Sequence, residues 1–213
     1  MKTDDLISML SAQVAPVDPH VAAKRFQWAL AAGGVMALAL MAAMYGVNPR
    51  LLDAAHQPMF WVKFGFPAAI FLVGLLLAAR VSIPGRPWRA AANNVLLPVL
   101  TMFLLAVVVL LNAEPQERLP MVLGKTWAVC ATRIALISSP LFLATIWAMN
   151  GLAPTQLRLA GAAAGLLAGG VGTVIYALHC PEMAAPFIAV WYTAGVLLTS
   201  AIGALLGPRL LRW

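Results

Sequence analysis

The chain contains only two cysteines, Cys130 and Cys180, and they are its main candidates for chemistry. Cys130 lies just inside the start of the fourth of six long apolar segments, and Cys180 follows the end of the fifth. Helices adjacent in sequence usually run antiparallel, so both thiols are expected at similar depth on one side of a bundle. A disulfide needs Cα atoms within about 7 Å, and packed helix axes lie about 8–10 Å apart. Two cysteines on the facing sides of neighbouring helices can meet this limit, so a disulfide between Cys130 and Cys180 is possible.

Charged and metal-ligating side chains accompany both cysteines. Arg133 follows Cys130 by three residues and shares its helix face, where a guanidinium group makes a thiol more reactive. His179 and Glu182 flank Cys180, and Cys-Cys-His-Glu is a ligand set for a soft metal ion. The spacing is not that of a zinc motif, and membrane cysteines also serve as small apolar packing residues. Three roles of the cysteines therefore remain possible. They are stress-sensing thiols, a metal site held by Cys130 and Cys180, and simple packing.

Two cations lie within the apolar segments. Arg133 needs an acidic partner, for which Glu182 and Glu117 are candidates, unless its side chain reaches the membrane surface. Lys63 stands near the start of the second segment, and we expect its side chain to extend outward to the interface.

The elements that position these residues are apolar helices. The chain has 213 residues, of which 62% are hydrophobic and 10% charged, against about 25% charged residues in soluble domains. Runs of about 20 apolar residues suit spanning helices, and the continuous apolarity argues against a β-barrel. We predict an all-α, polytopic membrane protein with a bundle of six spans. The expected spans are Phe26–Gly46, Phe60–Ala79, Ala92–Leu111, Trp127–Met149, Leu157–Leu178 and Pro186–Leu206.

The distribution of Lys and Arg predicts the orientation of this bundle. Six spans place both termini on one side, and that side carries nine of the 14 cations, whereas the other carries five. The loop from Arg80 to Arg89 alone holds three arginines and no acidic residue. The positive-inside rule then favours an N-in/C-in topology, with both thiols on the outer side. The net charge of +7 comes from cations spread over the ends of the apolar segments. They form no basic cluster of the kind that binds nucleic acid directly.

Small residues predict how the spans pack. Gly161, Gly165 and Gly169 repeat every four residues in the fifth span, and Gly203 and Gly207 do the same in the sixth. Such spacing allows helices to approach closely. Short loops also lead us to expect that spans consecutive in sequence are neighbours.

The chain divides into an arm of residues 1–25 and a transmembrane domain of residues 26–213. Residues 3–15 predict a short amphipathic helix with Asp4 and Asp5 in its first turn and apolar residues at Leu6, Ile7 and Leu10. A helix this short is marginal alone. It can lie on the bilayer, dock on its own bundle or fill a groove in a soluble partner, and its acidic start favours the partner.

Taken together, the chain resembles the NrsF-like bacterial membrane anti-sigma factors, over nearly its full length. The resemblance rests on the six-span layout, on Cys130, and on two motifs. The motifs are Thr3-Asp4-Asp5-Leu6-Ile7 with Leu10, and Leu178-His179-Cys180-Pro181-Glu182 leading to Phe187 and Trp191-Tyr192.

This resemblance implies a function that composition does not reveal. It implies an inner-membrane protein that is not an enzyme and that holds an extracytoplasmic-function sigma factor through its N-terminal arm. Asp4, Asp5, Leu6, Ile7 and Leu10 would contact the sigma factor. Heavy-metal or oxidative stress would release it, with Cys130 and Cys180 as the sensing thiols on the periplasmic side. No resident cofactor is expected, only a transient heavy-metal ion or a disulfide.

Two alternatives from other classes remain at this stage. The outer cysteines also fit a membrane thiol-redox protein, although no Cys-x-x-Cys pair or second cysteine pair is present for relay. A small transporter would need paired intramembrane charges and inverted repeats, and neither is evident in the sequence.

Overall fold

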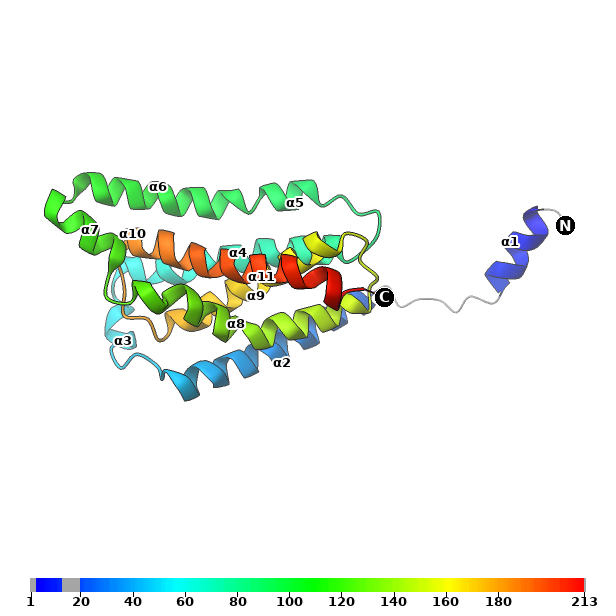
Figure 1. Cartoon of the computed structure of the whole chain (residues 1–213), viewed down its shortest axis with the longest axis horizontal. Coiled ribbons are helices and arrows are strands. Elements are labelled where there is room, and N and C mark those ends of the chain that lie inside the picture. Colours follow the sequence, from blue (N-terminus) through cyan, green and yellow to red (C-terminus); the bar gives the residue numbers. More distant parts are fainter. Residues whose placement is uncertain (1–2, 13–19, 213) are drawn as a thin grey trace.

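The computed structural model of the chain describes residues 3–12 and 20–212, and all regular structure in them is helical (Figure 1). Six helical segments are long and apolar enough to cross a membrane, which agrees with the predicted multi-pass protein. They consist of α2 (Val21–Met44), α4 (Pro58–Val81), α5 and α6 (Arg89–Asn93, Leu96–Asn112), α8 (Trp127–Asn150), α9 (Leu157–Ala177), and α10, η1 and α11 (Ala185–Phe187, Ile188–Tyr192, Thr193–Leu210). The shorter helices are α1 (Thr3–Ala12), α3 (Leu51–Ala54) and α7 (Pro115–Leu123).

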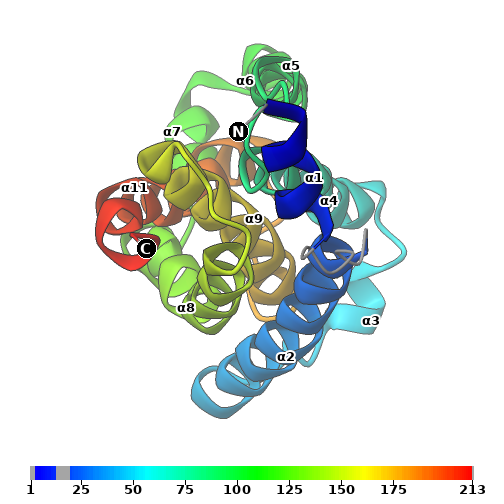
Figure 2. The ribbon, with the colours of Figure 1, turned by 90° about the vertical axis from the view of Figure 1, so that its right-hand side faces the viewer.

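The centre of the bundle is α9, which lies between α4, α8 and α11 (Figure 2). In its most apolar 18-residue stretch, 78% of residues are buried, against 17% in the segment formed by α5 and α6. The α5–α6 segment is therefore peripheral, and it touches the bundle mainly through α4, α10 and η1.

Glycines let α9 approach its neighbours closely on more than one side. A Cβ atom at Gly165 would lie 2.7 Å from the Ser200 Cα of α11, and one at Gly170 would lie 2.7 Å from the Phe71 backbone nitrogen of α4. Such separations are shorter than real Cβ contacts, so these positions exclude any larger residue unless a helix moves. The predicted packing role of the glycine repeat in the fifth and sixth spans is confirmed.

Not every pair of consecutive spans is in contact as expected. The pairs α8–α9 and α9–α11 pack closely, but α2 packs chiefly on α8, and α4 packs on α9. The small residues of α9 explain this arrangement, because they offer close contact to several helices at once. Two other features differ from the expectation: α2 begins at Val21, within the region assigned to the arm, and the loop before the fourth span contains the helix α7.

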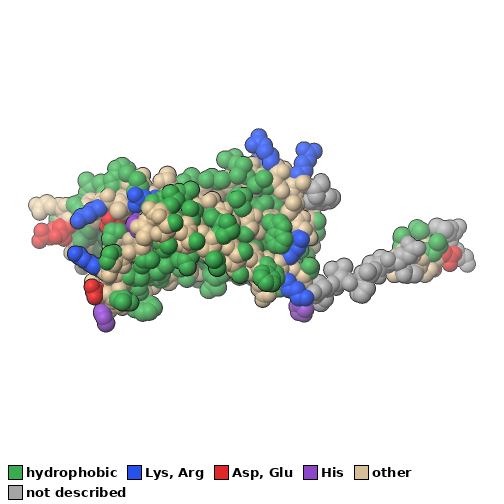
Figure 3. Space-filling model, turned by 90° about the horizontal axis from the view of Figure 1, so that it is seen from below, with side chains coloured by type: hydrophobic (Ala, Val, Ile, Leu, Met, Phe, Trp, Pro, Cys, Tyr) green, Lys and Arg blue, Asp and Glu red, His purple; other side chains and the backbone are tan. Residues whose placement is uncertain are grey.

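Charged side chains gather at the two ends of the bundle and leave an apolar belt between them (Figure 3). Within residues 20–212, all four acidic residues lie at the end that carries α3, α7 and α10; they are Asp53, Glu114, Glu117 and Glu182. We call this the thiol end. The opposite end, where α2 begins and α11 finishes, carries only cations among these residues, and we call it the arm end.

Candidate functional site: a buried thiol pair

The two cysteines lie together inside the thiol end. Cys130 stands in the first turn of α8 and is 0% exposed, and Cys180 follows α9 and is 1% exposed. The Cys180 backbone N–H donates to the Tyr176 carbonyl at 3.0 Å, which continues the last turn of α9. The thiols are close enough to interact electrostatically, and both are free, without a disulfide. The structure thus brings together the two residues that the sequence singled out.

Two fully buried tyrosines line this pair. The Tyr176 hydroxyl lies beside the Cys130 thiol, and the Tyr192 hydroxyl lies beside the Cys180 thiol. Their ring centroids are 6.1 Å apart at an interplanar angle of 65°. Neither hydroxyl makes a hydrogen bond of acceptable geometry to the described residues. Tyr192 ends η1, a π-helix, and such one-turn distortions are frequent at functional sites.

Lys63 is the residue of this site that sequence reasoning missed. We expected its side chain to reach the membrane surface, but it is 2% exposed and donates a hydrogen bond to the Cys180 carbonyl. Its electrostatic neighbours are Cys180, Glu182 and Cys130. An amine has to be held by local partners to stay inside a membrane span, and the Cys180 carbonyl, which follows the last turn of α9, supplies one. The signal available in the sequence was an ionisable residue within an apolar segment, three residues after its predicted start.

Arg133 is half-buried beside the site and does not use the acidic partners that we considered. Its guanidinium group lies 4.8 Å from the centroid of the Tyr45 ring of α2. The Glu182 carboxylate instead accepts hydrogen bonds from the Lys125 backbone N–H at 2.7 Å and from the Thr126 hydroxyl at 3.4 Å. The ring attracts the guanidinium charge, and the side chain is only half-buried, so Arg133 needs no carboxylate partner.

The Glu182 contact fixes the segment after Cys180 to the turn before α8. Gly124 in this turn has φ of 55°, and a Cβ atom there would lie 2.8 Å from a Glu182 carboxylate oxygen and 2.7 Å from the Phe187 ring. Glycine is therefore required by both conformation and space. On the same surface, the Trp191 indole donates to the Val122 carbonyl at 2.9 Å and its ring packs 5.5 Å from that of Trp127.

His179 is also engaged away from the thiols. Its Nδ1 lies 3.1 Å from the Gly46 carbonyl, and its ring packs against those of Tyr45 and Tyr176. Among residues 3–12 and 20–212, no group of three or more His, Cys, Asp or Glu side chains is placed to hold one metal ion. The Cys-Cys-His-Glu ligand set is therefore not assembled, because His179 and Glu182 bind other groups; of this set, only the two thiols lie close together.

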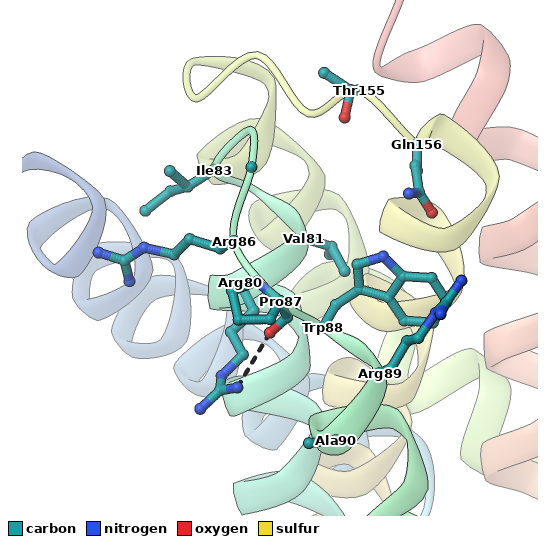
Figure 4. A pocket seen from close by; sticks show the side chains of 11 residues that line it. Arg80, Val81, Ile83, Arg86, Pro87, Trp88, Arg89, Ala90, Thr155 and Gln156 are labelled. Atoms are coloured by element: carbon teal, nitrogen blue, oxygen red, sulfur yellow. Dashed lines mark hydrogen bonds between the residues drawn. The ribbon is translucent and has the colours of Figure 1, made fainter.

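The arm end holds a pocket of about 400 Å³ between the α4–α5 and α8–α9 loops. Its lining includes Arg80, Arg86, Arg89 and Trp88 (Figure 4). Arg80 donates to the Pro87 carbonyl at 3.1 Å, while Arg86 and Arg89 point in opposite directions. The guanidinium groups do not converge on one point, so this pocket is not a preformed anion site.

The helix predicted in the arm is present as α1, with Asp4 and Asp5 in its first turn. Its apolar side chains are exposed: Leu6 by 42%, Ile7 by 58% and Leu10 by 63%. The residues that join α1 to the bundle, 13–19, lie outside the described residues.

Comparison with known proteins places this architecture in a family. The family model described as "Negative regulator of sigma F" (NrsF) matches residues 10–213, which include both cysteines and all six spans. The chain belongs to the NrsF family. The "Probable anti-sigma-F factor NrsF" of Azospira oryzae is 46% identical over 215 residues, and the "Anti-sigma-F factor NrsF" of Caulobacter vibrioides is 36% identical over 217 residues. Both alignments cover 100% of this chain and of the relative.

The NrsF match confirms the family resemblance and the prediction of a regulator that is not an enzyme. It starts at residue 10, so Asp4, Asp5, Leu6 and Ile7 precede the matched region, whereas the two NrsF relatives align over the whole chain. No solved structure matches the chain.

Proposed function

We propose that this protein is an anti-sigma factor of the bacterial inner membrane, which sequesters an extracytoplasmic-function sigma factor at the cytoplasmic surface. The observation that carries the proposal is the full-length similarity to two proteins named as anti-sigma-F factors, at 46% and 36% identity. A membrane anchor of six spans suits such a tether, since the described residues outside the spans form only the short helix of the arm and short loops.

The orientation that this function requires is N-in/C-in. Support comes from the arm end, where the described residues of the bundle include eight cations and no acidic residue. These cations are Lys24, Arg25, Arg80, Arg86, Arg89, Arg158, Arg209 and Arg212. Because cytoplasmic loops are enriched in Lys and Arg, the arm end faces the cytoplasm and the thiol end faces the periplasm.

The arm supplies the contact with the sigma factor. In α1, Leu6 and Leu10 lie one turn apart on the same face, Ile7 flanks them, and Asp4 and Asp5 precede them. An exposed apolar face of this kind fits a hydrophobic groove, and acidic residues at the start of the helix suit a groove with basic residues at its rim.

The thiol pair acts as the stress sensor. A thiophilic metal ion bridging Cys130 and Cys180, or an oxidant that joins them, changes the contact between α8 and the segment after α9. Since α8 packs along α2, and Arg25 near the start of α2 donates to the Ala148 carbonyl of α8 at 3.4 Å, a shift of α8 reaches the helix that follows the arm. A packed two-state bundle of this kind converts a local reaction into release of the partner.

Co-purification of the sigma factor with arm variants tests the sequestering function. Leu6→Asp places a charge on the apolar face of α1, and we expect the retained sigma factor to fall at least about tenfold, since burying a leucine is worth about 1.5–3 kcal/mol. Ser8→Asp adds the same charge to the opposite face and serves as the matched control. Equal retention by the wild-type protein and Leu6→Asp would remove α1 from the contact.

A further inference from the structure

The thiol pair is surrounded by hydrogen-bond donors that the resting structure uses poorly. The hydroxyl groups of Tyr176 and Tyr192 are buried beside the Cys130 and Cys180 thiols, and neither makes a hydrogen bond of good geometry to the described residues. Buried polar groups are usually paired, because leaving one unpaired costs free energy. Two such groups at one spot therefore call for a role.

Lys63 adds a positive charge and further donors to the same spot. An ammonium group has three N–H donors, and the Cys180 carbonyl is the acceptor that the described residues give it. The charged groups that face it include Glu182, but that carboxylate is hydrogen-bonded to Lys125 and Thr126. Arg133 is also near enough to Tyr176 to interact with it electrostatically, while its guanidinium group packs on the Tyr45 ring. A buried amino group thus stands near the two sulfur atoms.

We propose that Lys63, Tyr176 and Tyr192 form a donor set that receives the negative charge on the sulfur atoms when Cys130 or Cys180 reacts, with Lys63 as the positioning residue. This proposal rests on the thiol-sensing function proposed above. Tyr176 donates a hydrogen bond to the Cys130 sulfur, Tyr192 donates one to the Cys180 sulfur, and the Lys63 ammonium group stabilises the negative charge on either. A sulfur atom that attacks an electrophile or binds a metal ion does so as a thiolate, which is a strong hydrogen-bond acceptor.

The donor set also explains how a reaction at sulfur reaches the helices. Its members come from α4, α9 and η1, while Cys130 belongs to α8. The bond from Lys63 to the Cys180 carbonyl ties α4 to the segment after α9 in the resting state. A charged sulfur atom offers the ammonium group a stronger acceptor, so the tie between α4 and this segment is altered at the moment of sensing.

Alkylation kinetics of the full-length protein in detergent test the donor set without any sigma factor. N-ethylmaleimide is uncharged, and its rate of reaction is measured at one pH in Cys130→Ser and Cys180→Ser backgrounds, each of which keeps a single thiol. Lys63→Met should slow both thiols at least about tenfold, because the charge that favours the reactive thiolate is lost. Lys63→Arg keeps the charge and should restore most of the rate.

The tyrosine variants distinguish the donor role from a structural one, because a purely structural role would not slow one thiol selectively. Tyr192→Phe should slow Cys180 and leave Cys130 unchanged, whereas Tyr176→Phe should slow Cys130 and leave Cys180 unchanged. Tyr45→Phe, which removes a hydroxyl outside the donor set, is the matched control. Unchanged rates in Lys63→Met, or the same effect of each tyrosine variant on both thiols, would overturn the proposal. Loss of sigma-factor retention in the arm variants is a separate result, so the two proposals fail independently.

Discussion

Cys130 and Cys180 owe their properties to burial more than to their neighbours in sequence. At 0% and 1% exposure, they are shielded from charged, bulky reagents, and small uncharged reagents, thiophilic ions or oxidants are the species suited to reach them. Of the charged residues near them in the chain, Arg133 and Glu182 are bound to other groups, and the close cation is Lys63, which is distant in sequence. Reactivity at this site is therefore a property of the fold.

At the scale of single residues, we predict that sensing needs both thiols. Cys130→Ser and Cys180→Ser keep the size and polarity of the side chain, so the sigma factor stays bound and basal transcription stays low. Each variant should lose induction of sigma-dependent transcription by heavy-metal or oxidative stress, because one thiol cannot bridge. A transcriptional reporter measures this, with Leu6→Asp as the constitutively active reference. Normal induction in the double variant would remove the sensor.

At the scale of the helices, α9 is the element against which the others pack. Glycines on several of its faces bring α11, α4 and α8 into close contact, and the Ser200 hydroxyl of α11 donates to the Ala162 carbonyl of α9 at 3.0 Å. Packing this close leaves little room for gradual adjustment, so a change at one end moves whole helices.

The close contact between α9 and α11 predicts a stability effect. A Cβ atom at Gly165 meets the α11 backbone, so Gly165→Ala should lower the free energy of unfolding by about 1–3 kcal/mol through overpacking. Gly34→Ala in α2 is the matched control, because no atom lies within 4 Å of the added Cβ. Thermal unfolding of both variants in detergent measures the difference. Equal melting temperatures would contradict the close approach.

At the scale of the whole molecule, the ends of the bundle differ in charge, and the proposed function depends on which end faces the cytoplasm. The native thiols are too deeply buried to report on this. Exposed positions serve better in a background that carries Cys130→Ser and Cys180→Ser.

Labelling with a membrane-impermeant maleimide should therefore distinguish the two ends. Asp53→Cys at the thiol end should be labelled on intact spheroplasts, because the proposed N-in/C-in orientation places that end in the periplasm. Arg86→Cys at the arm end should be labelled only after lysis. Both side chains are exposed in the structure, so accessibility within the protein is matched. The reverse pattern would invert the orientation and remove the periplasmic sensor.

Much of the whole-molecule organisation could be predicted from the sequence, because it depends on local properties of the chain. Continuous apolar runs predicted the six spans, the four-residue glycine repeats predicted close helix packing by the fifth and sixth spans, and Asp4 with Leu6 and Leu10 predicted α1. Burial of apolar side chains, close approach of small residues and helix periodicity each act over a few residues, so their signals are visible in a single sequence.

Only the tertiary structure decided which helices pack together and what surrounds the thiols. Gly33 lets α2 approach α8, where a Cβ atom would lie 2.8 Å from the Leu141 Cα, and the segment after α9 presents a carbonyl to the buried Lys63. Tyr176 and Tyr192 reach the same place from α9 and η1. Contacts between residues so far apart in the chain depend on how whole helices fit, and no local pattern encodes that fit.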